Sequence, residues 1–273
     1  MPMFYEDMLS SGTVIRRYEN KYLIPESLCD EIRDYISFFC IPDPNAESGN
    51  GSYYVHSLYF DTPELGFFWD NRNRLLVRTK PRVRYFGLKP ADFVVLEVKR
   101  RVKNIVLKKR EVIPVDSWPG VLDSYRPDNR MRNMGDGPFA ERYVESFLEV
   151  VNAYGAVPVV HVRYLREAYV SEIDDYVRIT FDRQLSGCLA HGSYDLVVND
   201  DDFVWVDDPA TSNFFESPVI MEIKCEPIFP RWIVDLVQKF RLYKQGFSKY
   251  CNTLEKAHAE FFGNGASPFP RFG

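Results

Sequence analysis

The sequence predicts an α+β protein whose centre is a closed or nearly closed antiparallel β-barrel with helices packed outside. Several long runs alternate apolar and polar residues with the two-residue period of a strand. Neighbouring runs are joined by connections too short for a crossover helix, which favours antiparallel pairing. Several strand faces are charged, and a barrel covered by helices on its outside can keep such faces in a polar interior.

The expected elements follow in order along the chain. Residues 14–24 alternate and end at Pro25, which suits the first turn of a helix over residues 25–39 with one apolar stripe. A second helix follows Pro138 and stops at Gly155, and a last helix covers residues 230–246. The predicted strands are residues 14–24, 53–61, 73–86, 93–103, 105–115, 157–172, 176–182, 193–198, 203–206 and 218–225.

Domain organisation is expected to be simple. Turn-forming residues over 126–137 predict a surface loop, and the Gly- and Pro-containing tail after Phe262 is expected to fray. No linker and no fixed repeat divides the sequence. We therefore expect a single tunnel domain over residues 1–273, with its core over about 14–262.

Composition excludes several classes of protein. The chain has 273 residues, of which 45% are hydrophobic, and this suits a globular protein with a sizeable core. Its apolar runs are far shorter than the roughly 20 residues that span a bilayer. No basic region followed by an apolar one opens the sequence, so no signal peptide is visible and a cytoplasmic location is expected.

The cysteines and histidines argue against disulfides and zinc. Five cysteines are scattered along the chain without a Cys-x-x-Cys pair, which predicts free thiols. Four histidines are equally dispersed, with no two at the spacing of metal ligands on a helix. Any metal is therefore expected to be a hard ion held by oxygen.

Charge is distributed unevenly. The formal net charge is -5, yet the stretch from Arg72 to Arg110 contains 14 Lys or Arg and two acids. Within strands, an acid and a lysine recur two residues apart, at Glu19, Glu97 and Glu222, and therefore share a face. A further strand places Arg78, Lys80, Arg82 and Arg84 on one face.

These charged faces have two interpretations. Each acid–lysine pair alone could be an exposed ion pair, and the basic strand alone could be a solvated edge or a nucleic-acid patch. Together they fit a tunnel that holds linked phosphates, because arginine and lysine bind phosphate oxygens and carboxylates can hold a divalent ion. We expect no nucleic acid, since exposed aromatic residues do not interleave with the basic face.

Seven ordered motifs carry a resemblance to a known family. They are RYENKYL (17–23), SLYFDTP (57–63), RVRY (82–85), LEVKR (96–100), RITFD (178–182), EIK (222–224) and FSKYC (247–251). In this order they resemble the polyphosphate polymerase domain of the vacuolar transporter chaperone (VTC) family, which belongs to the triphosphate tunnel metalloenzymes. The resemblance implies a tunnel of about eight antiparallel strands. It also implies transfer of the terminal phosphate of ATP to a polyphosphate chain, with Mn²⁺ or Mg²⁺.

The resemblance and the charged faces together predict site residues. Positions matching the family's catalytic phosphate contacts are Lys21, Arg82, Arg84, Lys99, Arg178 and Lys249. Further substrate contacts are expected from Arg78, Lys80, Lys108, Arg110, Arg166, Lys224, Ser248 and Tyr59. The expected metal carboxylates are Glu222, Glu97 and Glu19. Glu222 matches the family's metal ligand, and Glu97 and Glu19 are expected mainly to orient their neighbours.

Two departures from the pattern affect the expected function. Hydrolytic members of the superfamily begin with Glu-x-Glu-x-Lys, whereas Arg17 stands at the first position here, which favours a polymerase. The sensing and membrane-spanning domains of eukaryotic members are not recognised, so the chain resembles a stand-alone, bacterial member. The expected ligands are ATP and polyphosphate or another phosphate-rich anion.

Several alternatives stay open at this point. The protein could be an inorganic triphosphatase or nucleoside triphosphatase, or a polyphosphate-binding module without catalysis. A membrane-protein partner and the oligomeric state are both undecided by the sequence.

Overall fold

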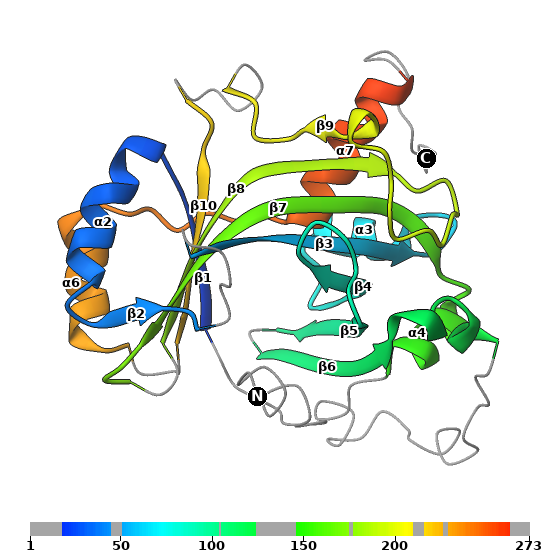
Figure 1. Cartoon of the computed structure of the whole chain (residues 1–273), viewed down its shortest axis with the longest axis horizontal. Helices are drawn as coiled ribbons and strands as arrows, with labels where there is room; N and C mark the ends of the chain where they lie inside the picture. Colours follow the sequence, from blue (N-terminus) through cyan, green and yellow to red (C-terminus); the bar gives the residue numbers. More distant parts are fainter. Residues whose placement is uncertain are drawn as a thin grey trace.

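The protein is described here by a computed structural model that covers residues 18–44, 51–103, 105–123, 146–174, 177–209, 216–225 and 229–262. Its centre is a curled antiparallel sheet with the strand order β1-β10-β8-β7-β3-β4-β5-β6 (Figure 1). The strands on this path are β1 (Tyr18–Ile24), β3 (Ser52–Asp61), β4 (Val77–Phe86), β5 (Phe93–Val102), β6 (Ile105–Pro114), β7 (Val157–Ser171), β8 (Arg178–Leu189) and β10 (Val219–Cys225). The predicted antiparallel tunnel architecture is therefore confirmed.

Short strands and helices complete the described part of the chain. Strand β2 (Cys40–Pro42) pairs with β7, and β9 (Val204–Trp205) pairs with β8. The α-helices are α2 (Cys29–Ile36), α3 (Gly66–Arg72), α4 (Phe147–Tyr154), α6 (Arg231–Lys239) and α7 (Lys249–Phe262). Single 3₁₀ turns are η1 (Glu26–Leu28), η2 (Val115–Ser117), η3 (Gly120–Leu122) and η5 (Asp200–Asp202).

The two ends of the strand order, β1 and β6, share no ladder in the described part of the chain. The outer edge of β1 pairs instead with the segment before α7. Tyr22 forms an isolated bridge with Lys244, and the amide of Gln245 donates to the carbonyl of Lys21 at 2.8 Å. The sheet is thus an open barrel whose first strand is partly covered by irregular chain.

Helices α2 and α6 cover one half of the outer face (Figure 1). Their apolar positions recur three and four residues apart, as on one side of a helix. Ile32 and Ile36 of α2 and Ile233 and Leu236 of α6 are all fully buried, and they share a core with Met221 of β10. Burying such side chains stabilises the fold by about 1.5–3 kcal/mol each.

Helix α4 covers the other half of the outer face. Ser146 and Glu149 form a capping box at its start, and Gly155 ends it in the left-handed conformation at a φ of 58°. Phe147 and Val150 are buried in a core that includes Leu96 of β5. The helix predicted after Pro138 is confirmed over this span, and residues 138–145 lie outside the described part.

Helix α7 differs from α2, α4 and α6 because it packs against the inner face of the sheet, in a core that also includes Phe68 of α3. Tyr250 stacks on Tyr59 of β3, with ring centroids 4.9 Å apart. Tyr59 lies directly opposite Arg82 in the ladder, so the two share a face. Gly187 of β8 permits this close approach, since a Cβ there would collide with Thr253 of α7 and the backbone of β7.

Some predicted elements have other bounds. The helix over residues 230–246 ends at Lys239, because Arg241 takes a φ of 48° and the chain then turns to pair with β1. The helix over 25–39 ends at Ile36 and leads into β2. Residues 193–198 form no strand, because the hydroxyl of Ser193 accepts from the amide of Asp195 in a local turn.

Helix α7 was not predicted, and in place of α3 the sequence predicts only a short helical turn that begins at residues 62–65. Asp61 initiates α3 by accepting hydrogen bonds from the amides of Phe67 and Phe68, each at 2.8 Å. The loop predicted over 126–137 and the tail after Phe262 lie outside the described residues. No helix in the described ranges is long and apolar enough to cross a membrane.

Candidate functional site

The inner face of the curled sheet carries rows of charged side chains. On one side of the barrel, Lys21 of β1 faces Glu222 of β10, and Glu222 faces Thr180 of β8. In the next row, Glu19 faces Lys224. The period of two along each strand places all of these side chains on the same surface, as the sequence predicts.

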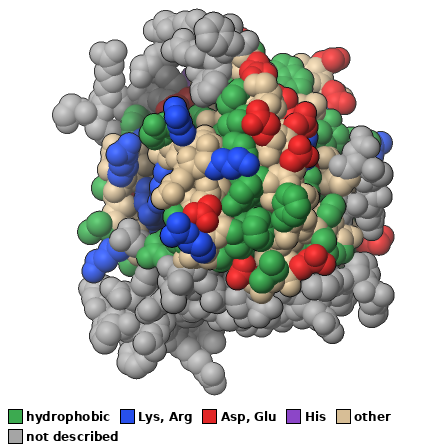
Figure 2. All heavy atoms as spheres, turned by 90° about the vertical axis from the view of Figure 1, so that its left-hand side faces the viewer, with side chains coloured by type: hydrophobic (Ala, Val, Ile, Leu, Met, Phe, Trp, Pro, Cys, Tyr) green, Lys and Arg blue, Asp and Glu red, His purple; other side chains and the backbone are tan. Residues whose placement is uncertain are grey.

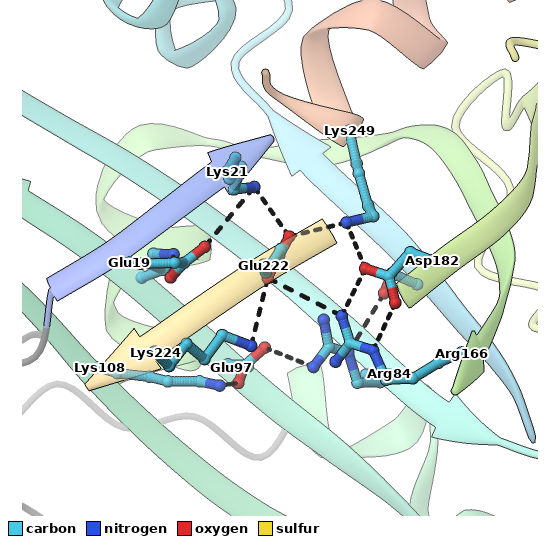
Figure 3. A network of polar contacts seen from close by, with 12 residues as sticks. Glu19, Lys21, Arg84, Glu97, Lys108, Arg166, Asp182, Glu222, Lys224 and Lys249 are labelled. Carbon is cyan, nitrogen blue, oxygen red and sulfur yellow. Dashed lines mark hydrogen bonds and ion pairs between the residues drawn. The ribbon is translucent and has the colours of Figure 1, made fainter. Parts of the chain in front are cut away.

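Glu222 is surrounded by cations from four elements (Figure 3). Its Oε1 lies 3.1 Å from the Nζ of Lys21 and 2.8 Å from the Nζ of Lys249. Its Oε2 lies 3.2 Å from the Nζ of Lys224 and 4.0 Å from Arg166. This carboxylate therefore joins β1, β7, β10 and α7.

Asp182 of β8 is a site residue that the predicted set omits. It is fully buried and accepts two parallel hydrogen bonds from Arg166, both at 2.7 Å. The Nζ of Lys249 lies 2.6 Å from it, so this lysine connects Asp182 with Glu222 (Figure 3). Its position two residues beyond Thr180 on one strand face was the available signal.

Glu97 of β5 organises the opposite wall. It is 1% exposed and forms ion pairs with Arg82 and Arg84 of β4 and with Lys108 and Arg110 of β6. The Nε of Arg110 lies 3.0 Å from Oε1 of Glu97, and Arg84 lies 3.7 Å from Oε2. One buried carboxylate thus holds four cations from its two neighbouring strands.

Glu19 connects the two walls across the interior. The Nζ of Lys99 on β5 lies 2.6 Å from Oε2 of Glu19, and the Nζ of Lys21 lies 3.6 Å from Oε1. Strands β1 and β5 are not neighbours in the sheet order. Their contact therefore shows that the charged rows face one another around a common interior.

Within the part of the chain that the structure describes, these ion pairs link nine cations and four carboxylates. The cations are Lys21, Arg82, Arg84, Lys99, Lys108, Arg110, Arg166, Lys224 and Lys249. The carboxylates are Glu19, Glu97, Asp182 and Glu222. This excess of positive charge is suited to a polyanion.

The first turn of α7 borders this network. The hydroxyl of Ser248 accepts from the amide of Cys251 and from the Nζ of Lys80 at 2.8 Å, so it caps the helix and holds a lysine. A helix N-terminus disfavours nearby cations and favours anions. Lys80, Ser248 and Lys249 together therefore make this position suitable for a phosphate group.

Tyr59 and Tyr250 help to hold Arg82 in place. The phenol oxygen of Tyr59 accepts a hydrogen bond from Arg82 at 2.6 Å, and Tyr250 stacks on the Tyr59 ring. The Tyr250 hydroxyl donates to buried Asp61 at the end of β3. Tyr59 therefore contacts a predicted phosphate ligand, while Asp61 organises the turn.

Cations determine the charge states of the network's acids. Burial alone would raise the pKa of Glu222, but Lys21, Lys249 and Lys224 outweigh it and lower the pKa far below its usual value. Burial is likewise outweighed at Glu19, mainly by Lys99. Both acids are therefore ionised at neutral pH.

Several cations lack full compensation. Burial, which disfavours the charged amine, lowers the pKa of Lys80 to about 7 and that of Lys224 to about 8. Burial and then Arg82 lower the pKa of Arg84 to about 10, and burial followed by Arg110 lowers the pKa of Lys108 strongly. A bound polyanion would reverse these shifts, because it supplies the missing negative charge.

Two predicted residues lie apart from the network. Arg178 is on the same face as Lys224 but pairs with Asp43, 3.5 Å away, in the segment after β2. Arg78 faces Arg101 across β4 and β5, and its Nε is buried without a hydrogen-bond partner in the described residues. Both positions extend the basic surface along the strands.

The three predicted metal carboxylates are not gathered in one place. Within the described ranges, no three carboxylate, histidine or cysteine side chains come together as a metal cluster. Glu97 is enclosed by four cations, and Glu19 and Glu222 flank Lys21. A carboxylate and a hydroxyl do lie side by side, because Glu222 faces Thr180, whose buried hydroxyl has no hydrogen-bond partner in the described residues.

A curled antiparallel sheet with a basic inner face spanned by a few carboxylates defines the triphosphate tunnel class of proteins. The chain belongs to the VTC domain family, whose model matches residues 16–258. The family predicted from the seven motifs is thereby confirmed. A bacterial origin stays a prediction.

Solved structures of low sequence identity resemble the chain over most of its length. The PH1819 protein of Pyrococcus horikoshii OT3 is 15% identical, covers 88% of this chain and 99% of its own, and has a TM-score of 0.42. A proposed adenylate cyclase of Bacillus halodurans is 9% identical, with coverages of 86% and 96% and a TM-score of 0.43. The Mimivirus capping enzyme triphosphatase is 11% identical, with coverages of 87% and 92% and a TM-score of 0.31. No curated protein matches the sequence.

Proposed function

We propose that the protein is a polyphosphate polymerase-like phosphotransferase that transfers the γ-phosphate of ATP to a growing polyphosphate chain. The observation that carries this proposal is the inner face itself, where nine cations meet four carboxylates. Linked phosphates supply one negative charge per unit along a line, and the cations extend along several neighbouring antiparallel strands. Membership of the VTC domain family supports the same function.

The side chains contribute mainly by positioning and by charge neutralisation. Arg82, Arg84 and Arg166 suit phosphate oxygens through parallel hydrogen bonds, and Lys21 and Lys99 supply compact charges. In the transfer, a terminal oxygen of the acceptor chain bonds to the γ-phosphorus while the bond to the β–γ bridging oxygen breaks. ADP leaves with the electron pair, and an anionic acceptor oxygen needs no general base.

The residues fit a divalent cation that would be held partly by a protein carboxylate and partly by the phosphates of the substrate. Mg²⁺ is commonly bound by one or two carboxylates together with substrate phosphates, and needs no cage made only of protein. Ionised Glu222 would hold Mn²⁺ or Mg²⁺, with the Thr180 hydroxyl beside it, once the weakly basic Lys224 is displaced. The ion would neutralise charge on the transferred phosphate.

One observation favours a second candidate, a polyphosphate-binding module without catalysis. Glu222 already contacts Lys21, Lys224 and Lys249, and in this arrangement it balances lysines in place of a metal. Such a module would retain polyphosphate but release no ADP from ATP. A triphosphatase would instead release orthophosphate from tripolyphosphate.

The adjacent lysines Lys108 and Lys109 allow a matched test. Lys108 lies on the inner face and contacts Glu97, whereas Lys109 is opposite Val98, whose side chain belongs to the outer core. Purified wild-type protein incubated with ATP and Mn²⁺ is expected to give long anionic chains on gels and stoichiometric ADP. Lys108→Ala and Glu222→Ala are expected to lower chain formation by about 10²-fold or more, and Lys109→Ala to leave it unchanged.

The products separate the candidates. Binding of polyphosphate by wild type without ADP release identifies the binding module, and orthophosphate release without chain growth identifies the triphosphatase. Equal loss of activity in Lys108→Ala and Lys109→Ala, with both variants folded by circular dichroism, would contradict the assignment of the inner face as the site.

A further inference from the structure

Three consecutive large apolar residues are exposed where β4 begins. Leu75, Leu76 and Val77 are 48%, 67% and 42% exposed. We refer to these three residues as the apolar tip. Isolated exposed apolar residues are common, but a contiguous set with a polar rim indicates an interaction surface.

The rim of the apolar tip is strongly basic. Residues 71–79 and 98–103, which lie on the two adjoining strands and their approaches, contain no acid. Val77 pairs with Val102 and Arg78 with Arg101, so these two segments are adjacent in space. The cations of the two segments are Arg72, Arg74, Arg78, Lys99, Arg100, Arg101 and Lys103. Two of them pair with acids from other elements, Arg72 with Glu255 and Lys99 with Glu19.

Backbone hydrogen bonds hold the apolar tip in place. The amide of Lys103 donates to the carbonyl of Leu76 at 2.7 Å, and the amide of Leu75 donates to the carbonyl of Asp70 at 2.9 Å. The Nε of Arg101 donates to the carbonyl of Lys103 at 2.9 Å. The exposed apolar residues are thus presented by a fixed turn next to cationic side chains.

We propose that the apolar tip and its basic rim dock the protein on an anionic lipid bilayer surface. Apolar side chains at the end of a turn can enter the boundary between headgroups and acyl chains. Lysines and arginines around them are attracted to the negative surface potential of anionic lipids. The apolar tip is thus suited to the acyl chains of a leaflet, and the basic rim to its anionic headgroups. The charge of the rim is the reason to choose an anionic bilayer as the partner.

A phosphate chain alone would not account for the surface. Cations bind polyphosphate without help from exposed leucines, and the apolar tip would gain nothing from such a ligand. The basic rim of the apolar tip is, however, continuous with the charged inner face of the sheet. Arg78 and Arg101 are each two residues along their strands from Lys80 and Lys99, and therefore lie on the same face. Docking would therefore hold one end of the basic inner face close to the bilayer.

The hairpin of β4 and β5 supplies matched controls at its other end. Leu88 is 75% exposed in the turn between these strands, and Lys89 follows it. The full chain is sedimented with vesicles of phosphatidylcholine alone or mixed with phosphatidylglycerol, in the presence of excess tripolyphosphate, which under the proposed function competes for the inner-face cations. Wild type is expected to bind only the anionic vesicles.

The variants divide the apolar contribution from the charge contribution. Leu76→Asp is expected to weaken vesicle binding about tenfold, and Lys103→Glu about fivefold or more. Leu88→Asp and Lys89→Glu are expected to bind as wild type does. The proposal is overturned if wild type does not bind the anionic vesicles in the presence of tripolyphosphate, or if the variants at the two ends of the hairpin behave alike. None of these outcomes depends on catalytic activity, so failure of the proposed phosphotransfer is detected separately.

Discussion

Lys80 differs from the other inner-face lysines because its amine contacts a neutral hydroxyl group. Its Nζ donates to the hydroxyl of Ser248, whereas Lys21, Lys99 and Lys249 each contact a carboxylate. A buried amine without an anionic partner loses its proton more easily, and burial accordingly lowers the pKa of Lys80 to about 7. The protonation of Lys80 is therefore expected to change when an anion binds to the inner face.

Polyphosphate affinity is expected to fall as the pH rises above 7. In the free protein Lys80 is then neutral, and a bound polyanion restores its charge, so that binding takes up a proton in this range. Linkage gives a decline of up to about tenfold per pH unit for one proton. Calorimetry with tripolyphosphate in buffers of different ionisation enthalpy measures the uptake directly.

Lys80→Arg removes this proton uptake, because arginine stays charged, and is expected to flatten the pH dependence. Lys109→Arg on the outer face is the control and should keep the wild-type slope. An unchanged slope in Lys80→Arg would contradict the role of Lys80.

The free energy of unfolding of the ligand-free protein depends on pH in the opposite direction. Above pH 7 the amine of Lys80 has lost its proton in the folded protein but keeps it in the unfolded chain, so the contribution of Lys80 to stability rises with pH.

At the scale of elements, the strands follow from the sequence and α7 does not. Alternation with period two predicts strands and the face of each charged residue, because a strand that is half buried repeats its environment every second residue. The existence of β3, β5, β6, β7 and β10 was predicted within a few residues. The distances between walls, such as that from Lys99 to Glu19, depend on how far the sheet curls and are not encoded in local patterns.

Helix α7 was not predicted, because the last predicted helix covers residues 230–246 and no helix was assigned after it. Lys249 lies just beyond that predicted helix and is the first residue of α7. Ser248 as a capping residue and the apolar spacing of Tyr250 and Leu254 were the available signals. Asp182 was likewise visible on its strand face, but its bond to Arg166 arises from pairing between β7 and β8.

Gly187 is expected to be essential for the seating of α7 on the sheet. A methyl group at this position would collide with Cγ2 of Thr253 on α7 and with the carbonyl oxygen of His161, and the carbonyl belongs to the backbone of β7, so it cannot give way without shifting that strand. Gly187→Ala is expected to lower the free energy of unfolding by about 2–3 kcal/mol in urea titrations. In Gly120→Ala the new methyl group points into open space, and a change within about 0.5 kcal/mol is expected. Equal stability of the two variants would disprove the close packing of α7.

At the scale of the whole molecule, charge is divided between surfaces. The chain carries a net charge of -5, although its inner face has more cations than acids. Figure 2 shows one outer view, on which most visible Lys and Arg side chains gather on one half and most Asp and Glu on the other. Repulsion among the inner cations destabilises the free protein, and the four inner carboxylates offset part of it.

Glu97→Gln is expected to make the free protein depend on a polyanion for stability. The change keeps the shape of the side chain but leaves four cations without their carboxylate, which is expected to destabilise by about 3–5 kcal/mol. Tripolyphosphate should restore much of this loss, since it supplies negative charge to the same cations. Thermal unfolding with and without tripolyphosphate measures both effects.

Glu111→Gln serves as the control, because Glu111 is exposed on β6, opposite Leu96 of the outer core. Its unfolding temperature should match that of wild type under both conditions. If tripolyphosphate stabilises Glu97→Gln no more than wild type, the anion does not reach the cations around Glu97.

The long sequence separation of the residues around Glu222 determines when the site can first exist. Glu222 meets Lys21 from the first described strand and Lys249 from the last described helix. During synthesis the ribosome must therefore release the residues of α7 before the interior is complete, and pairing across such separations is slow. Under the proposed function, a phosphate polymer would therefore meet the full set of cations around Glu222 only after translation has passed α7.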